Sequence, residues 1–163
     1  MNIRKLTIAA LLVALAVVAS PLSLPMGAAR VFPIQHIVNV LAAVILGPAY
    51  AVMQAFVTSL IRNIIGTGTL LAFPGSMMGA LMAGLLHKKF GKGVKTNLIP
   101  AFAGEVFGTG VLGALLAYPV ARFLMGREAA MFAYVIPFLL STMTGAAIAV
   151  IILRAILNTG ILE

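Results

Sequence analysis

Apolar residues fill six long runs of the chain, and proline, glycine or clustered lysines separate the runs. The runs cover approximately residues 4–20, 34–46, 49–65, 74–86, 98–124 and 129–157. Pro21 and the Gly47-Pro48 pair mark run ends, because proline removes a backbone donor and glycine favours a turn. The pattern therefore predicts six helices that occupy nearly the whole chain.

Three local features modify this picture of regular helices. The run over residues 34–46 is short for a hydrocarbon core of about 30 Å, so we do not expect it to cross a bilayer alone in a straight line. Residues 22–33 contain two prolines and Gly27 and are expected to form a loop. Pro137 lies inside the last run and is expected to kink that helix.

The composition indicates that these helices lie in a membrane. Of 163 residues, 63% are hydrophobic, only 9% are charged and 16 are glycine. A soluble domain of this size still exposes about a third of its surface to water, which so apolar a chain cannot cover with polar groups. The run over residues 4–20 resembles a signal peptide, but Pro21 disfavours cleavage, so we keep it as the first helix. We expect one all-α integral membrane domain over residues 1–163.

The basic residues predict an orientation in the membrane. Lysine and arginine number 11 against 3 acidic residues, a net charge of +8. Six spans place both termini on one side, and that side carries Arg4, Lys5, Lys88, Lys89, Lys92, Lys95 and Arg154. The opposite side carries Arg30, Arg62, Arg122 and Arg127. Basic residues are enriched in cytoplasmic segments, so we expect cytoplasmic termini and a multi-pass protein of a prokaryotic cytoplasmic membrane.

Several chemical classes find no support in the sequence. The basic residues form no stripe with interleaved aromatics, which argues against a nucleic-acid partner. Cysteine is absent, so disulfides, thiolate nucleophiles and Cys-type metal sites are excluded. His36 and His87 are expected on opposite sides of the membrane, HExxH is absent, and Ser76 carries no protease motif. We therefore expect no cofactor, no metal and no enzymatic activity.

The second predicted helix begins with a cluster of polar side chains. Gln35, His36 and Asn39 lie in its first two turns, beside Arg30 in the preceding loop. His36 and Asn39 are three residues apart and share a helix face. Such residues also cap helices or bond neighbouring helices, but three of them within five positions favour a binding pocket.

The third predicted helix ends with Arg62 and Asn63, followed by the loop Gly66-Thr67-Gly68-Thr69. One interpretation is that Arg62 extends to water at the membrane boundary. The alternative is that Arg62 and Asn63 point inwards and bind polar atoms of a ligand. The glycines would then allow the loop to act as a lid.

Glu105 is the one acidic residue inside an apolar run. A carboxylate in hydrocarbon is costly, so we expect Glu105 to be protonated, paired or in a water-filled cavity. A functional role for Glu105 is therefore the default hypothesis. A structural hydrogen bond between helices is the alternative. Helical rise places Glu105 roughly 20 Å below Tyr118 and Asn39 roughly 8 Å below its helix start. One compact pocket can hold both only if the fifth helix is tilted or the cavity reaches past the middle of the membrane.

Aromatic residues near the outer helix ends are candidates for stacking on a flat heterocycle. Interfacial aromatics also occur without any ligand, so each is informative only beside the polar residues. The candidates are Phe32, Phe73, Tyr118, Tyr134 and Phe138.

The polar segments resemble the ThiW family, substrate-binding subunits of energy-coupling factor transporters. The resemblance rests on Ala10-x-x-x-Ala14 in the first helix, a proline-rich outer loop, and the following segments, which together extend over essentially the whole chain. They are VFPIQHIVNVLAAVILGP (residues 31–48), LIRNIIGTGTLLAFPGS (60–76), GEVFGTG (104–110) and LLAYPVA (115–121).

The resemblance implies an S component, a six-helix subunit that captures a vitamin-type solute from outside. It implies a transmembrane coupling (T) subunit and two cytoplasmic ATPase subunits as partners, with Ala10 and Ala14 on the docking face. The implied substrate is hydroxyethylthiazole, the thiazole precursor of thiamine. Arg30 and Arg62 exceed what a neutral ligand requires, so phosphorylated thiazole and the pyrimidine precursor remain alternatives, as does a structural subunit without ligand.

Overall fold

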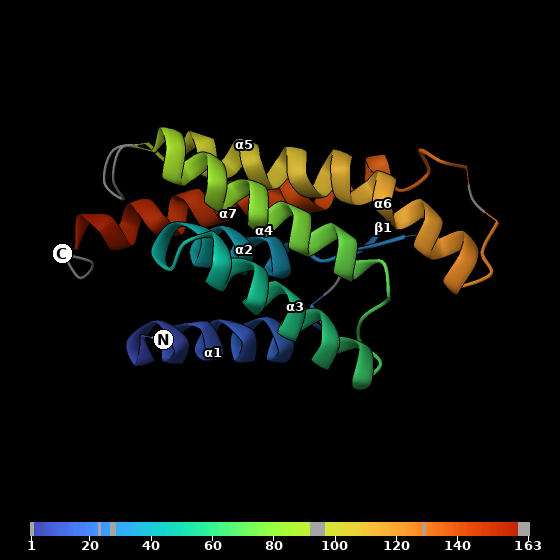
Figure 1. The fold of residues 1–163 in the computed structure, drawn as a ribbon, viewed down its shortest axis with the longest axis horizontal. Helices are drawn as coiled ribbons and strands as arrows, with labels where there is room; N and C mark the ends of the chain where they lie inside the picture. The colour runs from blue at the N-terminus through green and yellow to red at the C-terminus, as the bar shows by residue number, and fades with distance from the viewer. Residues whose placement is uncertain (1, 23, 27–28, 92–96, 129, 160–163) are drawn as a thin grey trace.

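Six helical segments and one short hairpin form the part of the chain that the computed structural model describes, residues 2–22, 24–26, 29–91, 97–128 and 130–159 (Figure 1). The side chains of residues 24–26, 29 and 30 lie outside that description. The elements are α1 (Ile3–Val18), β1 (Leu24–Met26), β2 (Ala29–Val31), α2 (Pro33–Ile45), α3 (Pro48–Ile64), α4 (Ala72–Phe90), α5 (Ile99–Phe107), η1 (Gly108–Gly113), α6 (Ala114–Pro119), η2 (Val120–Leu124) and α7 (Val135–Asn158).

The short helix α2 lies at the centre of the bundle. Ten of its thirteen residues are buried, and it packs against α1, α3, α4, α5 and α7. A helix enclosed on all sides must be apolar around most of its circumference, which is the pattern of its second half. The few polar side chains of α2 therefore point at other helices rather than at the surroundings.

Glycine and proline set the reversal between α2 and α3, as the sequence predicts. Gly47 has a φ of 92°, a left-handed conformation that glycine adopts without strain. Pro48 then begins α3, and Pro33 begins α2 in the same way. The first helical position suits proline because its missing N–H would have no partner there.

The fifth segment is one continuous helix over Ile99–Leu124, with wide π-helical turns at η1 and η2. Its glycines bring it close to α4: a Cβ on Gly104 would lie 2.6 Å from the Cα of Ala83, and one on Gly108 would lie 2.8 Å from the Cα of Gly79. Small residues allow helix backbones to approach in this way. The contact places Glu105 directly beside α4.

Three expectations about helix ends need correction. The α4 helix continues to Phe90, so His87, Lys88 and Lys89 lie in its last turn rather than in a loop, where cations are favourable near the carboxyl end of a helix. The last helix begins at Val135 rather than near residue 129. Pro137 therefore lies in its first turn, where no backbone donor is lost, and produces no kink.

The loop expected over residues 22–33 contains a hairpin. β1 and β2 pair antiparallel, with Leu24 opposite Val31 and Pro25 opposite Arg30. The hairpin leads directly into α2, and the backbone N–H of Phe32 donates a hydrogen bond to Ser141 Oγ of α7 at 3.0 Å. The start of α2 is thus held under the hairpin.

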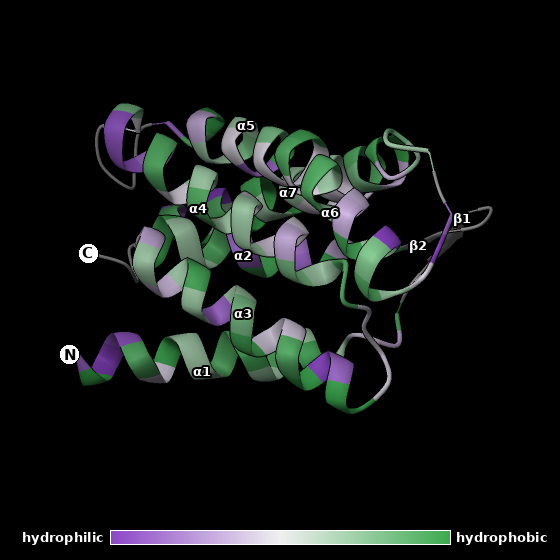
Figure 2. Ribbon diagram, turned by 45° about the vertical axis from the view of Figure 1, so that its right-hand side comes forward, coloured by the Kyte–Doolittle hydropathy of each residue, from purple (hydrophilic) through white to green (hydrophobic). Residues whose placement is uncertain are grey.

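Apolar residues predominate along the helices (Figure 2), and many of them are exposed on the outside of the bundle. Exposed fractions reach 79% for Val18, 78% for Phe123 and 68% for Ile151. Within the described residues, Ile99–Leu124 and Val135–Asn158 are long and apolar enough to cross a membrane. Surface of this kind is compatible with lipid and costly in water, which places the protein in a membrane. The start of α1 and the end of α7 lie at the same end of the bundle (Figure 1).

Candidate functional site

A cavity of about 300 Å³ lies at the end of the bundle that holds the hairpin, the α3–α4 loop and the connection from η2 to α7. Its polar side chains and its two arginines come from several helices and loops that meet there. It is lined by Phe32, Gln35, His36, Arg62, Thr69, Leu71, Ala72, Gly75, Ser76, Thr109, Arg127, Tyr134, Pro137, Phe138 and Ser141.

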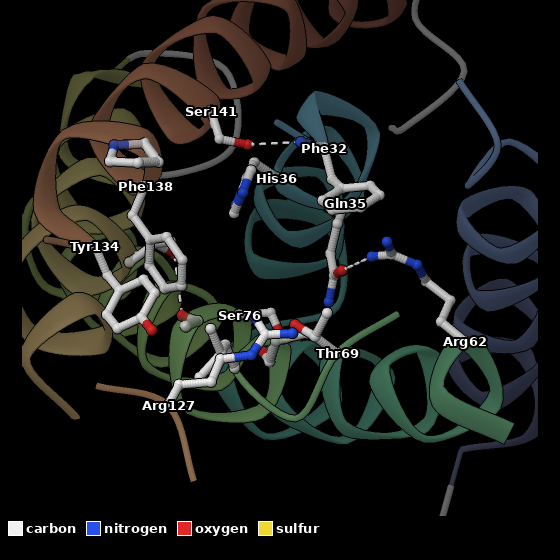
Figure 3. A pocket seen from close by; sticks show the side chains of 15 residues that line it. Phe32, Gln35, His36, Arg62, Thr69, Ser76, Arg127, Tyr134, Phe138 and Ser141 are labelled. Atoms are coloured by element: carbon white, nitrogen blue, oxygen red, sulfur yellow. Dashed lines mark hydrogen bonds between the residues drawn. The ribbon is translucent and has the colours of Figure 1, made fainter. Parts of the chain in front are cut away.

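Aromatic rings form the walls of the cavity. The rings of Tyr134 and Phe138 lie 6.3 Å apart between centroids and are tilted by 51°, and Phe32 lies across the cavity from them (Figure 3). Gly75 makes room for Phe138, because a Cβ at Gly75 would lie 2.9 Å from Phe138 Cε2. The walls therefore present flat apolar faces to any occupant.

Glu105 forms the centre of a buried polar cluster beneath the cavity. Its Oε1 accepts hydrogen bonds from Asn39 Nδ2 at 3.1 Å and Thr109 Oγ1 at 3.0 Å, and it lies 2.8 Å from His36 Nδ1. The side chain is fully buried. Three polar partners on one oxygen offset much of the cost of burying a carboxyl group. The cluster joins α2 to α5 and η1.

Arg62 forms a second buried cluster on the opposite wall. It is 2% exposed; its Nη1 donates to Gln35 Oε1, and its Nη2 donates to the Thr67 carbonyl at 3.2 Å. The guanidinium lies 4.3 Å from the centroid of the Phe32 ring, a distance that favours cation–π attraction. Arg62 thereby joins α3, the start of α2 and the α3–α4 loop.

The two clusters are connected through serine hydroxyls. Gln35 Nε2 donates to Ser59 Oγ at 3.0 Å, and Ser59 Oγ lies 3.0 Å from Ser76 Oγ. The backbone carbonyl of Ser76 accepts from Asn39 Nδ2 at 3.1 Å. Polar networks of this kind orient their members in a low-dielectric interior. The α2, α3 and α4 side chains around the cavity are therefore positioned together.

The predicted site residues divide into three groups. Gln35, His36, Arg62 and Tyr134 line the cavity, and Asn39 and Glu105 support it from behind. The predicted depth difference between Asn39 and Glu105 disappears because α2 begins inside the bundle, under the hairpin, rather than at its outer boundary. Pro33 at the start of α2 is already buried.

Three predicted residues lie away from the cavity. Asn63 Nδ2 donates to the carbonyls of Ser59 at 2.8 Å and Thr69 at 3.0 Å, and so holds the α3–α4 loop. Phe73 packs against Phe56 with ring centroids 5.7 Å apart. Tyr118 accepts a hydrogen bond from Arg122 at 2.7 Å on the exposed surface. The side chain of Arg30 lies outside the described residues.

Five polar or charged lining residues were not predicted as site residues: Thr69, Ser76, Thr109, Arg127 and Ser141. A signal existed for Thr109, which follows Glu105 by four positions and so shares its helix face. Ser76 bonds to the Ala72 carbonyl at 2.7 Å and to Ser59, rather than to His36. For Arg127 and Ser141 the sequence offers no comparable signal, because their place in the cavity depends on how α7 packs.

The chemistry of the lining favours binding of a neutral or anionic ring compound. Among the described lining residues, the charged side chains are both arginines, and Arg127 is exposed with no carboxylate paired to it. Within the described part of the chain, no group of three His, Cys, Asp or Glu side chains is placed to hold a metal ion. Aromatic walls with a few convergent polar groups are typical of sites for small organic molecules.

Comparison with models of protein families gives a match over nearly the whole chain. Residues 6–159 match the family model of ThiW, described as thiamine-precursor transporter protein. The matched residues include α1 from its fourth position, both polar clusters and every residue that lines the cavity. No curated protein and no solved structure matches the chain.

Proposed function

Since the chain belongs to the ThiW family of thiamine-precursor transporters, we propose that it is the substrate-capture (S) component of an energy-coupling factor transporter. Hydroxyethylthiazole is the proposed occupant of the cavity. The observation that carries this proposal is a small cavity with aromatic walls and a hydrogen-bonding floor, in a chain whose family transports a thiamine precursor.

The size and lining of the cavity support a small heterocycle. A volume of about 300 Å³ lies at the lower end of the range for ligand pockets, which suits a single substituted ring. Tyr134, Phe138 and Phe32 offer faces for stacking, and His36 and Ser76 offer polar atoms near the floor. A thiazole ring with one hydroxyl requires little more than these groups.

In the proposed topology all six helical segments cross the membrane and the cavity faces outwards. The distribution of charge supports this orientation, because Lys5, Lys88 and Lys89 lie at the end of the bundle opposite the cavity, and lysine-rich ends face the cytoplasm. Both termini then lie in the cytoplasm. Substrate from outside reaches the cavity without crossing the bundle.

The proposed partners are a transmembrane coupling subunit and two cytoplasmic ATPase subunits. Ala10 and Ala14 are exposed on α1, whereas Ala9 and Ala16 face the bundle and are buried. A stripe of small residues allows another helix to approach closely in lipid. This arrangement supports Ala10 and Ala14 as the contact for the coupling subunit.

Phosphorylated thiazole is the second candidate, and Arg127 favours it. The guanidinium belongs to an exposed residue at the cavity and has no acidic partner among the described residues, and arginine binds phosphate oxygens with planar paired donors. The pyrimidine precursor and a structural subunit without ligand are further alternatives, distinguished by the same experiment.

Thermal unfolding of the detergent-solubilised protein tests these alternatives. A ligand that binds only the folded state raises the midpoint of unfolding in a concentration-dependent way. Hydroxyethylthiazole, its phosphate and the aminopyrimidine alcohol are compared at equal concentrations, without nucleotide. The largest shift is expected with hydroxyethylthiazole; a larger shift with its phosphate identifies the anion as substrate, and no shift with any compound contradicts a capture function.

A further inference from the structure

We propose that His36 accepts a hydrogen bond from the ligand through its Nε2, and that Glu105 is a positioning residue that holds His36 in the tautomer this requires. The inference rests on the proposed function and deepens it. It specifies the substrate class as an uncharged ring compound with a hydroxyl or amino donor at its buried end.

The hydrogen bonds of Glu105 determine which atom of His36 carries the proton. Asn39 Nδ2 also donates to the Ser76 carbonyl at 3.1 Å, so the amide is oriented with its nitrogen towards Glu105 Oε1. Thr109 Oγ1 lies 3.0 Å from the same oxygen and shares its one hydrogen between that oxygen and the Gly75 carbonyl. An oxygen that accepts from these donors acts as the acceptor for His36 Nδ1 as well, at 2.8 Å. His36 therefore carries its proton on Nδ1.

The other ring nitrogen of His36 is left for the ligand. His36 lines the cavity. Its Nε2 has no hydrogen-bond partner among the described residues, and it is not one of their fully buried polar atoms without a partner, so a ligand can reach it. In a neutral imidazole with hydrogen on Nδ1, Nε2 presents a lone pair and accepts hydrogen bonds. A ligand atom placed there must donate.

Glu105 acts on the ligand only through His36. It is fully buried and is not among the residues that line the cavity. Its second oxygen, Oε2, has no hydrogen-bond partner in the part of the chain that the structure describes. It lies against α4, where a Cβ on Gly79 would be 2.7 Å away. The carboxyl group therefore faces the neighbouring helix rather than the ligand.

The charges around the cavity affect which ligands fit. Arg62 and Arg127 are the charged side chains among the described lining residues, and their positive field disfavours a cationic ligand. The site should take a neutral thiazole with a free hydroxyl and discriminate against its methyl ether and against an N-alkylated thiazolium.

Two ligands and one substitution test the role of Nε2. Hydroxyethylthiazole and its methyl ether differ in the donor hydrogen, and His36→Asn keeps a side-chain N–H near Nδ1 for Glu105 while it removes Nε2. Calorimetry on the wild-type protein should show about tenfold weaker binding of the ether, the value of one hydrogen bond. In His36→Asn the two compounds should bind with nearly equal affinity.

The possible failures of this experiment are distinct. Equal affinities for alcohol and ether in the wild-type protein overturn the role of His36 and leave the capture of thiazole intact. An unchanged alcohol-to-ether ratio in His36→Asn also overturns it. If neither compound binds the wild-type protein, the proposed function fails and this inference fails with it.

A spectroscopic measurement tests the role of Glu105 without any ligand. The chain contains two histidines, so His87→Gln leaves His36 as the one imidazole in an ¹⁵N-labelled sample. Long-range ¹H–¹⁵N correlation spectra should show hydrogen on Nδ1 and a bare Nε2, and addition of Glu105→Ala should shift the population towards the Nε2–H tautomer. Two results overturn the role of Glu105. One is an Nδ1–H signal that is unchanged when Glu105→Ala is added to His87→Gln. The other is a His36 ring that is protonated on both nitrogens in the His87→Gln protein itself.

Discussion

His36 Nδ1 and Glu105 Oε1 lie 2.8 Å apart inside the bundle, although the two residues are 69 positions apart in the chain. The contact connects the central helix α2 to α5, and Asn39 and Thr109 complete it. Because these groups are buried together, removal of one takes a partner away from each of the others, which costs more than the net gain of a typical hydrogen bond. The pair is thus expected to matter for the fold as well as for the site.

Glu105→Ala is expected to destabilise the protein by about 2 kcal/mol. In a buried position His36 Nδ1 loses its carboxyl partner, and Asn39 and Thr109 each lose one of two acceptors. Thermal or denaturant unfolding in detergent measures the change. Glu128→Ala serves as the matched control, because Glu128 is exposed and should give a change close to zero. Equal effects of the two substitutions would contradict a central role for the Glu105 cluster.

Two threonines provide a second comparison of buried hydroxyl groups. Thr109 Oγ1 contacts Glu105 Oε1 and the Gly75 carbonyl, whereas Thr142 Oγ1 is buried without a partner. Thr109→Val should lower the free energy of unfolding by about 1 kcal/mol, and Thr142→Val should leave it unchanged or raise it slightly. The reverse order would show that the hydrogen bonds of η1 do not contribute to stability.

Arg62→Lys is expected to weaken ligand binding about tenfold, because an ammonium group cannot reproduce both the paired hydrogen bonds and the stacking of a guanidinium. The lost contacts are those with Gln35, the Thr67 carbonyl and the Phe32 ring. Calorimetry measures the affinity. Arg122→Lys on the exposed surface should bind like the wild-type protein; equal losses in both variants would exclude a specific role for Arg62.

Ala10→Trp or Ala14→Trp should abolish uptake in cells that contain the coupling and ATPase subunits, because a bulky side chain separates the packed helices. Ligand binding by the purified variants should be unchanged, since neither residue lines the cavity. Leu15→Trp, at a position of α1 that is 52% exposed and does not share the face of Ala10 and Ala14, should retain uptake. Loss of binding in the alanine variants would instead make α1 part of the site.

The helix boundaries that proline and glycine set were predictable from the sequence. The end of α2 and the start of α3 lie within one residue of the predicted positions, because Gly47 and Pro48 act locally. The hairpin of β1 and β2 and the late start of α7 were not predicted. Both depend on tertiary packing, and an apolar run contains no local signal that separates its helical part from a loop packed on the bundle.

The polar cluster of α2 was predictable because few polar residues occur in the apolar runs. Gln35 and His36 line the cavity, and Asn39 and Glu105 support it. Asn63 was expected in the pocket but bonds to its own loop. Helical spacing alone does not determine which side of a helix end faces the bundle. The contacts of residues near helix ends were therefore the least predictable.

The most direct test of the central claim is calorimetric titration of the purified protein with hydroxyethylthiazole, without nucleotide and without partner subunits. The account predicts saturable binding at one site per chain, weakened in Arg62→Lys and unchanged in Ala10→Trp. Absence of binding by hydroxyethylthiazole, together with clear binding of a different solute, would contradict the assigned substrate. Absence of binding by every thiamine precursor would contradict a capture component.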